Sequence, residues 1–176
     1  MRPLRVVLIG PECTGKTWLA GELAAHYAVP SAPEHAREYV ERHGAALTYA
    51  DVEAIARGQE AGEDAAIARA EVQGASLVVL DTDLVSTTVY AEHYYGECPA
   101  WIMTAARERL ATLYLLCEPD IPWTADGVRD QPSARHRLHG AFRDRLLSLG
   151  ATVASVHGVG DARVACAMDA LASLRA

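Results

Sequence analysis

Near its N-terminus the chain reads LRVVLIGPECTGKT over residues 4–17. The first six residues are apolar and rich in β-branched side chains, which predicts a short buried strand. The next eight match the pattern G-x-x-x-x-G-K-[ST] in full. The spacing of leucine and alanine over residues 16–27 then predicts a helix. A strand, a glycine-containing loop and a helix in this order are typical of a phosphate-binding loop, so the sequence predicts a nucleotide site.

The residue types of this loop indicate its chemistry. Gly10 and Gly15 let the backbone fold tightly, so that successive N–H groups point at phosphate oxygens, and the helix that begins near Lys16 adds the positive end of its dipole. Lys16 is expected to reach the β and γ phosphates, and the hydroxyl of Thr17 to coordinate Mg²⁺. The predicted cofactors are therefore ATP and Mg²⁺. The predicted nucleotide-binding residues are Gly10, Glu12, Cys13, Thr14, Gly15, Lys16, Thr17 and Trp18.

Strands and helices alternate along the rest of the chain. Further apolar runs predict strands at residues 29–32, 77–80, 112–117 and 152–156. Helices are predicted at residues 34–43, 51–73, 84–95, 100–109, 133–149 and 161–174. Because the strands are continuous apolar runs rather than alternating ones, they are expected to form a parallel sheet covered on both faces. The predicted fold is a three-layer α/β P-loop NTPase fold with a five-stranded parallel sheet.

Composition excludes several classes of function. The chain has 176 residues, 51% of them hydrophobic, which suits one domain over residues 1–176. The formal net charge of −7 argues against a nucleic-acid partner bound through a basic face. The four cysteines are widely spaced, which favours free thiols in a reducing cytosol. No apolar stretch approaches the ~20 residues that cross a bilayer, so we expect a cytoplasmic protein without a membrane partner. The oligomeric state is left open.

An acidic triplet, Asp81-Thr82-Asp83, follows the predicted strand at residues 77–80. Asp81 is the natural candidate to hold Mg²⁺ through water, because it stands at the end of a strand expected to neighbour the phosphate loop. Asp83 has three open roles: a second metal ligand, a contact to substrate, or a simple cap for the helix that it precedes.

A kinase is favoured over a GTPase. Lys16 is the only lysine of the chain, so the Asn-Lys-x-Asp segment that reads guanine is absent. A small-molecule kinase needs a carboxylate to orient and deprotonate the acceptor hydroxyl. Glu34 and Arg37 follow the second predicted strand and share a helix face. Glu34 is the leading candidate for the base, with Asp81 or Asp83 as open alternatives. Arg37 either binds the acceptor or forms an ordinary surface ion pair.

A kinase also needs mobile arginines that neutralise charge in the transition state. Arg129 lies in a short loop between a glycine and a proline, and Arg137 follows in the next predicted helix. Both are expected to close over ATP, with a solvated basic face as the alternative. Positions on a solvated helix face are expected for Arg135, Arg143 and Arg145.

Together these residues resemble the nicotinamide riboside (NR) kinase domain of the NadR family. The likeness rests on four stretches in the family's order, with Arg137 downstream: GPECTGKT, SAPEHAREYVE, LDTDLVSTT and WTADGVR. The resemblance implies transfer of the γ-phosphoryl group of ATP to the 5′-hydroxyl of NR, a step of NAD biosynthesis. It implies catalytic roles for Lys16, Glu34, Asp81, Arg129 and Arg137. It implies substrate contacts by Glu34 and Tyr94, and Arg37, Asp83 and Trp123 are further candidates for the substrate site.

One position departs from the family pattern. Pro33 stands where relatives commonly have an aromatic residue that packs on the base. Trp123 is a candidate for this stacking surface, or it packs only within its loop, and Tyr94 matches a tyrosine that stacks on the pyridine ring. Two other functions remain open: a kinase for another nucleoside or small alcohol, and a non-catalytic ATP-binding sensor.

Overall fold

The computed structural model describes residues 2–44, 46–122 and 134–174. Five strands form one sheet in the order β2-β3-β1-β4-β5, and neighbouring strands pair in parallel. The strands are β1 (Leu4–Ile9), β2 (Ser31–Ala32), β3 (Leu77–Asp81), β4 (Leu113–Cys117) and β5 (Val153–Val156). The predicted five-stranded parallel sheet is therefore confirmed.

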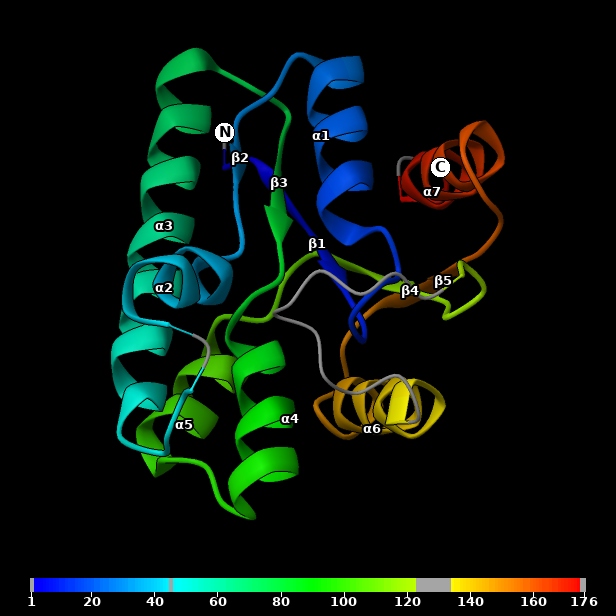
Figure 1. Cartoon of the computed structure of the whole chain (residues 1–176). Coiled ribbons are helices and arrows are strands. Elements are labelled where there is room, and N and C mark those ends of the chain that lie inside the picture. The colour runs from blue at the N-terminus through cyan, green and yellow to red at the C-terminus, as the bar shows by residue number, and fades with distance from the viewer. Residues whose placement is uncertain (1, 45, 123–133, 175–176) are drawn as a thin grey trace.

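Helices cover both faces of this sheet (Figure 1). Within the described ranges they are α1 (Lys16–Tyr27), α2 (His35–His43), α3 (Asp51–Gln73), α4 (Leu84–Tyr95), α5 (Ala100–Glu108), α6 (Arg135–Ser148) and α7 (Asp161–Ser173). Helices α1 and α7 pack on one face, and α3, α4, α5 and α6 pack on the other. The predicted three-layer arrangement is confirmed.

Alternation along β1 shows why the strands are apolar throughout. Val6 and Leu8 pack toward α1 and α7, whereas Val7 and Ile9 pack toward the opposite helices, and all four are buried. Every residue of β3 and β4 is buried as well. A strand with helices on both sides has no solvent face for polar side chains, which is what the continuous apolar runs predicted.

The element boundaries lie within two residues of the predicted ones. The largest difference at a strand is β2, which begins at Ser31 rather than at residue 29. The N–H of Val29 donates to the carbonyl of Ala24 at 3.0 Å and so belongs to the end of α1. The ladder to β3 begins only where the carbonyl of Pro30 accepts the N–H of Val79 at 3.1 Å.

The carboxyl ends of β1 and β3 meet at the edge of the sheet that carries the site. Leu8 of β1 pairs with Asp81 of β3, so the chain leaves both strands at the same level. The first residue after β1, Gly10, has φ +135, and a Cβ there would lie 2.9 Å from the carbonyl oxygen of Cys117 in β4. Only glycine fits this close approach. In the described part of the chain, no helix is both long enough and apolar enough to span a membrane.

Candidate active site

The phosphate loop, residues 10–17, leads from β1 to the N-terminus of α1. Gly15 precedes the helix with φ 74, and no side chain caps this helix end by a hydrogen bond. Lys16 is buried, and its Nζ donates to the carbonyl of Pro11 at 2.9 Å. The hydroxyl of Thr14 donates to the same carbonyl at 2.8 Å. An uncapped helix start beside a held ammonium group has the features of an anion site, and the nucleotide-binding roles of these residues stay predictions.

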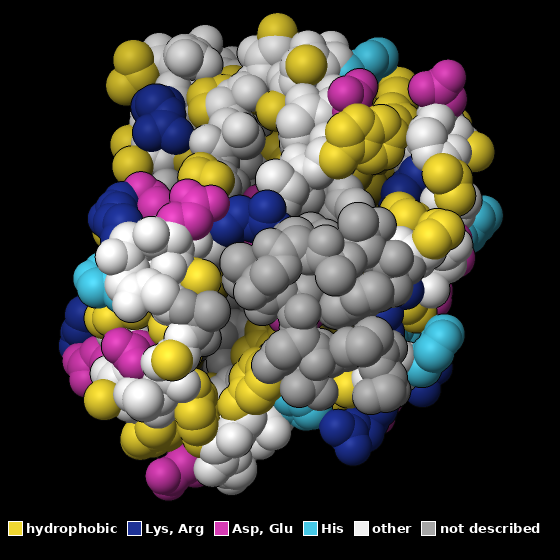
Figure 2. All heavy atoms as spheres, in the orientation of Figure 1, with side chains coloured by type: hydrophobic (Ala, Val, Ile, Leu, Met, Phe, Trp, Pro, Cys, Tyr) yellow, Lys and Arg dark blue, Asp and Glu magenta, His cyan; other side chains and the backbone are white. Residues whose placement is uncertain are grey.

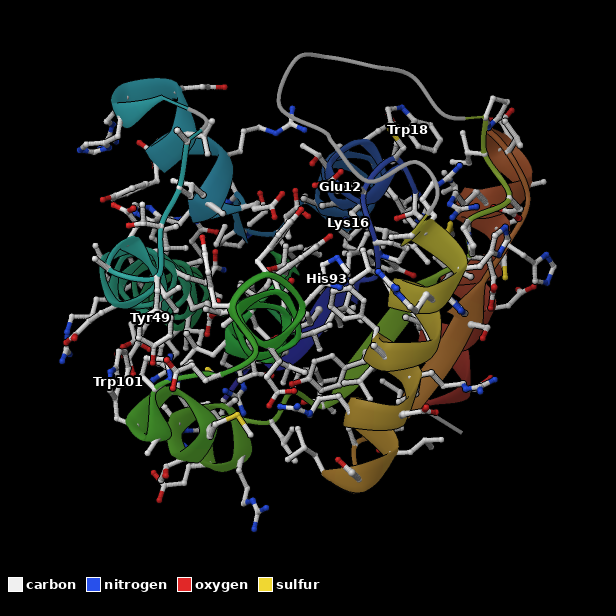
Figure 3. The ribbon with its side chains drawn as sticks, turned by 60° about the horizontal axis from the view of Figure 1, so that its bottom comes forward. Glu12, Lys16, Trp18, Tyr49, His93 and Trp101 are labelled. Carbon is white, nitrogen blue, oxygen red and sulfur yellow. The ribbon has the colours of Figure 1, made fainter. Side chains whose placement is uncertain are left out.

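Figure 3 shows this part of the site from the open edge of the sheet. Glu12 and Lys16 lie together at the end of β1, between α2 and α6, and Trp18 lies beside them at the start of α1. Trp18 is 44% exposed. The side chains expected to bind the nucleotide are thus gathered around one helix N-terminus.

Asp81 is buried at the end of β3, and its carboxylate oxygens have no hydrogen-bond partner among the described residues. Burying an unpaired carboxylate costs several kcal/mol, so such a group requires a cation or another partner. Burial raises the pKa of the Cys117 thiol to about 11. The charges of Lys16 and Asp81 lie close enough to this thiol to influence its pKa as well. Asp81 therefore belongs to the surroundings of the phosphate loop.

These residues fit a magnesium ion that arrives with nucleotide phosphates. Mg²⁺ is usually held by one or two protein oxygens together with phosphates and water, rather than by a cage of side chains. Within the residues that the structure describes, no three His, Cys, Asp or Glu side chains form a metal cluster. Thr17 at the exposed start of α1 and Asp81 at the end of β3 would supply the two oxygen ligands expected from the sequence, and this assignment stays a prediction.

A cavity of about 700 Å³ adjoins the phosphate loop and extends between α2, α3 and α4. It brings together residues that the sequence singled out: its walls include Glu34 and Arg37 of the α2 region, Tyr94 of α4, and the loop residues from Glu12 to Trp18. Acidic and basic side chains also lie side by side on the outer surface where α2 and α3 run (Figure 2). The cavity thus has a phosphate end and a mixed polar and aromatic end.

Tyrosine side chains form an aromatic wall along α4. Tyr90 and Tyr94 are stacked, with ring centroids 6.1 Å apart and an interplanar angle of 17°. Tyr95 meets Tyr49 edge to face at 5.8 Å. Tyr90, Tyr94 and Tyr95 line the cavity. Only Tyr94 was predicted, although the recurrence of tyrosine at residues 90 and 94, one helical turn apart, was a usable signal.

Asp83 is not part of the cavity wall. Its carboxylate accepts the N–H of Val85 at 3.0 Å and the hydroxyl of Tyr114 at 2.6 Å, and the residue is buried. The predicted alternative, a cap for the following helix, is confirmed, and the structure does not bring this residue to the substrate side. Burial raises the pKa of Asp83 to about 6. Burial and the nearby charge of Asp83 raise the pKa of Glu63 in α3 to about 8.

The arginines of α6 are arranged differently from expectation. Arg135 is buried, and its guanidinium donates to the carbonyls of Cys13 at 2.8 Å and Ile121 at 2.9 Å, so the predicted solvated position is wrong. Because Cys13 is a loop residue, this arginine braces the phosphate loop. Arg137 is exposed and does not line the cavity, and its catalytic role stays a prediction.

The remaining predicted arginines and Trp123 divide into three cases. Arg145 is also not solvated, because it pairs with Glu92 at 2.5 Å. Arg143 is exposed, as predicted. Trp123 and Arg129 lie outside the described residues, so their assignments stay predictions.

Sequence reasoning missed a buried arginine beneath the phosphate loop. Arg163 of α7 has no exposed surface and donates to Asp120 at 2.7 Å and to the carbonyls of Gly158 at 2.6 Å and Glu118 at 2.8 Å. Its Nε lies 3.9 Å from where a Cβ of Gly15 would stand. Arg163 therefore holds the loops that follow β4 and β5 against the phosphate loop, and no local sequence signal indicated this.

A helix start left open for an anion, beside a buried carboxylate with no hydrogen-bond partner among the described residues, is the arrangement by which P-loop proteins bind nucleoside triphosphates. The chain is a P-loop protein with the fold of the nucleoside kinases. A family model described as an AAA domain matches residues 5–163, and the chain belongs to this family.

The chain is also similar to the trifunctional NAD biosynthesis/regulator protein NadR. Identity is 32% over 148 residues to NadR of Salmonella typhimurium, covering 82% of this chain and 35% of that protein. The same values hold for NadR of Escherichia coli. The predicted resemblance to NadR is confirmed, and the chain spans about a third of the length of these relatives.

Solved structures give the same picture. The fold matches NadR protein in complex with NR at a TM-score of 0.77 and 25% identity, covering 98% of this chain and 50% of that one. It matches NadR in complex with NAD and AMP-PNP at a TM-score of 0.76 and 24% identity, covering 98% and 49%. Thymidylate kinase from Ehrlichia chaffeensis shares the fold at a TM-score of 0.70 and 12% identity, with 99% and 100% covered.

Proposed function

We propose that this chain is a kinase that transfers the γ-phosphoryl group of ATP to the 5′-hydroxyl of NR, forming nicotinamide mononucleotide. One observation carries the proposal: a single cavity of about 700 Å³ joins the phosphate loop to Glu34 and Arg37. This volume lies within the range of sites for small molecules, and the two ends of the cavity have the polarity that a phosphate donor and a nucleoside acceptor require.

The donor phosphates are held at the N-terminus of α1. Lys16, which now donates to the carbonyl of Pro11, exchanges this partner for phosphate oxygens. Arg135 keeps the loop in shape by its bond to Cys13. When bound with ATP, Mg²⁺ at Thr17 and Asp81 supplies charge neutralisation on the phosphates.

The acceptor lies at the other end of the cavity. Its hydroxyl oxygen forms the new bond to the γ phosphorus while the bond to the β–γ bridging oxygen breaks and ADP leaves. Glu34, which lines the cavity, accepts the hydroxyl proton, and Arg37 offsets negative charge at the transferred group. The rings of Tyr90 and Tyr94 give the base an aromatic surface.

Several observations support this choice of substrate and setting. The NadR fold covers 98% of this chain, and NadR has been solved in complex with NR and in complex with NAD and AMP-PNP. ATP as donor, Mg²⁺ as its ion and a cytoplasmic location belong to the proposal. The four cysteines are free thiols, which fits a reducing compartment.

The test is an acceptor panel. The purified protein is incubated with Mg-ATP and with NR, the common ribonucleosides and deoxynucleosides, or shikimate, and ADP release is followed against a Lys16→Ala control. We expect NR to accelerate ADP release and the control to remain inactive with every acceptor. Acceleration only by another panel member would keep the kinase and replace the substrate. Slow ATP hydrolysis that no acceptor accelerates would refute the kinase assignment.

A further inference from the structure

Gln59 of α3 connects the two ends of the site. The residue lines the cavity but is only 3% exposed. Its Oε1 accepts the N–H of His35 at 2.9 Å, and its Nε2 donates to the carbonyl of Thr82 at 3.2 Å. Because an N–H faces one end of the amide and a carbonyl the other, the orientation of the amide group is fixed. One side chain therefore ties the start of α2 to the turn after β3.

The start of α2 carries the proposed acceptor residues. His35 is the first residue of α2 and directly follows Glu34, and Arg37 comes one half-turn later. The first N–H groups of a helix need partners from outside the helix. Glu34 makes no capping hydrogen bond, and Gln59 satisfies the N–H of His35 instead.

The turn after β3 follows directly on the proposed metal ligand, Asp81. Thr82 stands between Asp81 and Asp83 and has φ 66, a left-handed conformation that a β-branched residue rarely adopts. Its N–H donates to the carbonyl of Leu8 in β1 at 3.0 Å, while its carbonyl accepts from Gln59. The turn that follows Asp81 is thus held from the sheet on one side and from α3 on the other.

A steric contact next to Gln59 reinforces the junction. The imidazole of His35 lies directly on Gly58, where any Cβ would overlap the ring. Helix α2 packs across α3 in this region (Figure 1). The bare backbone of Gly58 and the amide of Gln59 therefore dock the first turn of α2 at one defined position on α3.

We propose that Gln59 is a positioning residue for phosphoryl transfer, which sets Glu34 at the start of α2 relative to Asp81 at the end of β3. The inference rests on the proposed function. Phosphoryl transfer requires the acceptor hydroxyl and the γ-phosphate to meet in line, and a displacement of about 1 Å can lower turnover by about 100-fold. A residue bonded to both halves controls this alignment without contacting the reacting atoms.

The test compares Gln59→Leu, which removes the hydrogen bonds to His35 and Thr82 at similar size, with Gln73→Leu, the same change at the exposed end of α3. We expect Gln59→Leu to lower kcat with NR by about 10- to 100-fold, with ATP affinity within about twofold of the parent protein. In a Glu34→Gln background the same substitution should lower kcat by less than about threefold, because Gln59 acts through Glu34. Gln73→Leu should leave kcat unchanged.

A second variant keeps the inference testable if Gln59→Leu fails to fold. Gly58→Ala leaves the Gln59 amide in place but displaces the His35 ring, and should raise the KM for the acceptor while leaving ATP affinity unchanged. Full kcat in Gln59→Leu, or an equal fold-loss with and without Glu34→Gln, would overturn the inference while leaving the kinase assignment standing. If the parent protein and Gln73→Leu show no acceptor-dependent ADP release, the proposed function fails, and the positioning role fails with it.

Discussion

At the scale of single residues, Asp81 shows a conflict between stability and function. The residue is 1% exposed, and its carboxylate has no hydrogen-bond partner among the described residues. A buried charge of this kind destabilises the ligand-free fold. Residues kept at such a cost are typical of sites where a ligand supplies the missing partner.

Asp81→Asn should therefore stabilise the ligand-free protein and inactivate it. Removing the charge is expected to raise the free energy of unfolding by about 1 kcal/mol, which corresponds to a Tm increase of roughly 2–4 °C for a domain of this size. Turnover with Mg-ATP should fall by about 100-fold or more. Thermal unfolding and steady-state kinetics check the two parts, with Asp169→Asn on the exposed side of α7 as the control. A drop in Tm would show that the carboxylate has a partner in the ligand-free fold.

At the scale of elements, α3 shows what a sequence pattern reveals and what it hides. Its 23 residues and both of its boundaries were predicted, because a long charged, alanine-rich segment without proline favours a helix. Its buried stripe contains Ala56, Ala66 and Ala70, but also Gln59 and Glu63. Glutamine and glutamate in such a helix ordinarily indicate a solvated face. Their burial depends on partners that are distant in sequence, His35 and Thr82 for Gln59 and Arg109 for Glu63, so it could not be predicted.

The Glu63 carboxyl should make stability depend on pH. Burial raises its pKa to about 8 in the folded chain, far above the ordinary value of a glutamate. The folded state therefore keeps a proton that the unfolded chain releases, so stability is fully present below about pH 4.5 and is lost as pH rises toward 8. The loss approaches about 1.4 kcal/mol per pH unit for one proton.

Denaturant unfolding between pH 5 and 8 checks this expectation. Glu63→Gln, whose neutral amide can still bond Gln59, should lack most of the decline. Glu53→Gln, a change at an exposed position of the same helix, should decline as the parent protein does. Parallel curves for the parent protein and Glu63→Gln would show that this carboxyl titrates normally.

At the scale of the whole molecule, the alternation of apolar strands and helices was enough to predict the layers and the parallel sheet. It also predicted that the phosphate loop and the end of β3 would meet, because parallel strands end at one edge. The contacts that fix their relative positions were not predictable. Arg135 reaches Cys13 across 122 residues, and Gln59 reaches His35 across 24. Such bonds depend on packing between elements, which local patterns do not encode.

The central claim also concerns the whole molecule: one cavity holds the phosphate donor at the phosphate loop and the acceptor at Glu34. Glu34→Gln tests it most directly, since the change removes the proposed base and keeps the shape of the side chain. Its control is Glu41→Gln, a solvent-exposed change on the same helix. The measurement is kcat with NR together with the affinity for Mg-ATP. We predict a fall in kcat of roughly 100-fold or more with unchanged ATP affinity for Glu34→Gln, and no effect for Glu41→Gln. Unchanged kcat in Glu34→Gln would contradict the account.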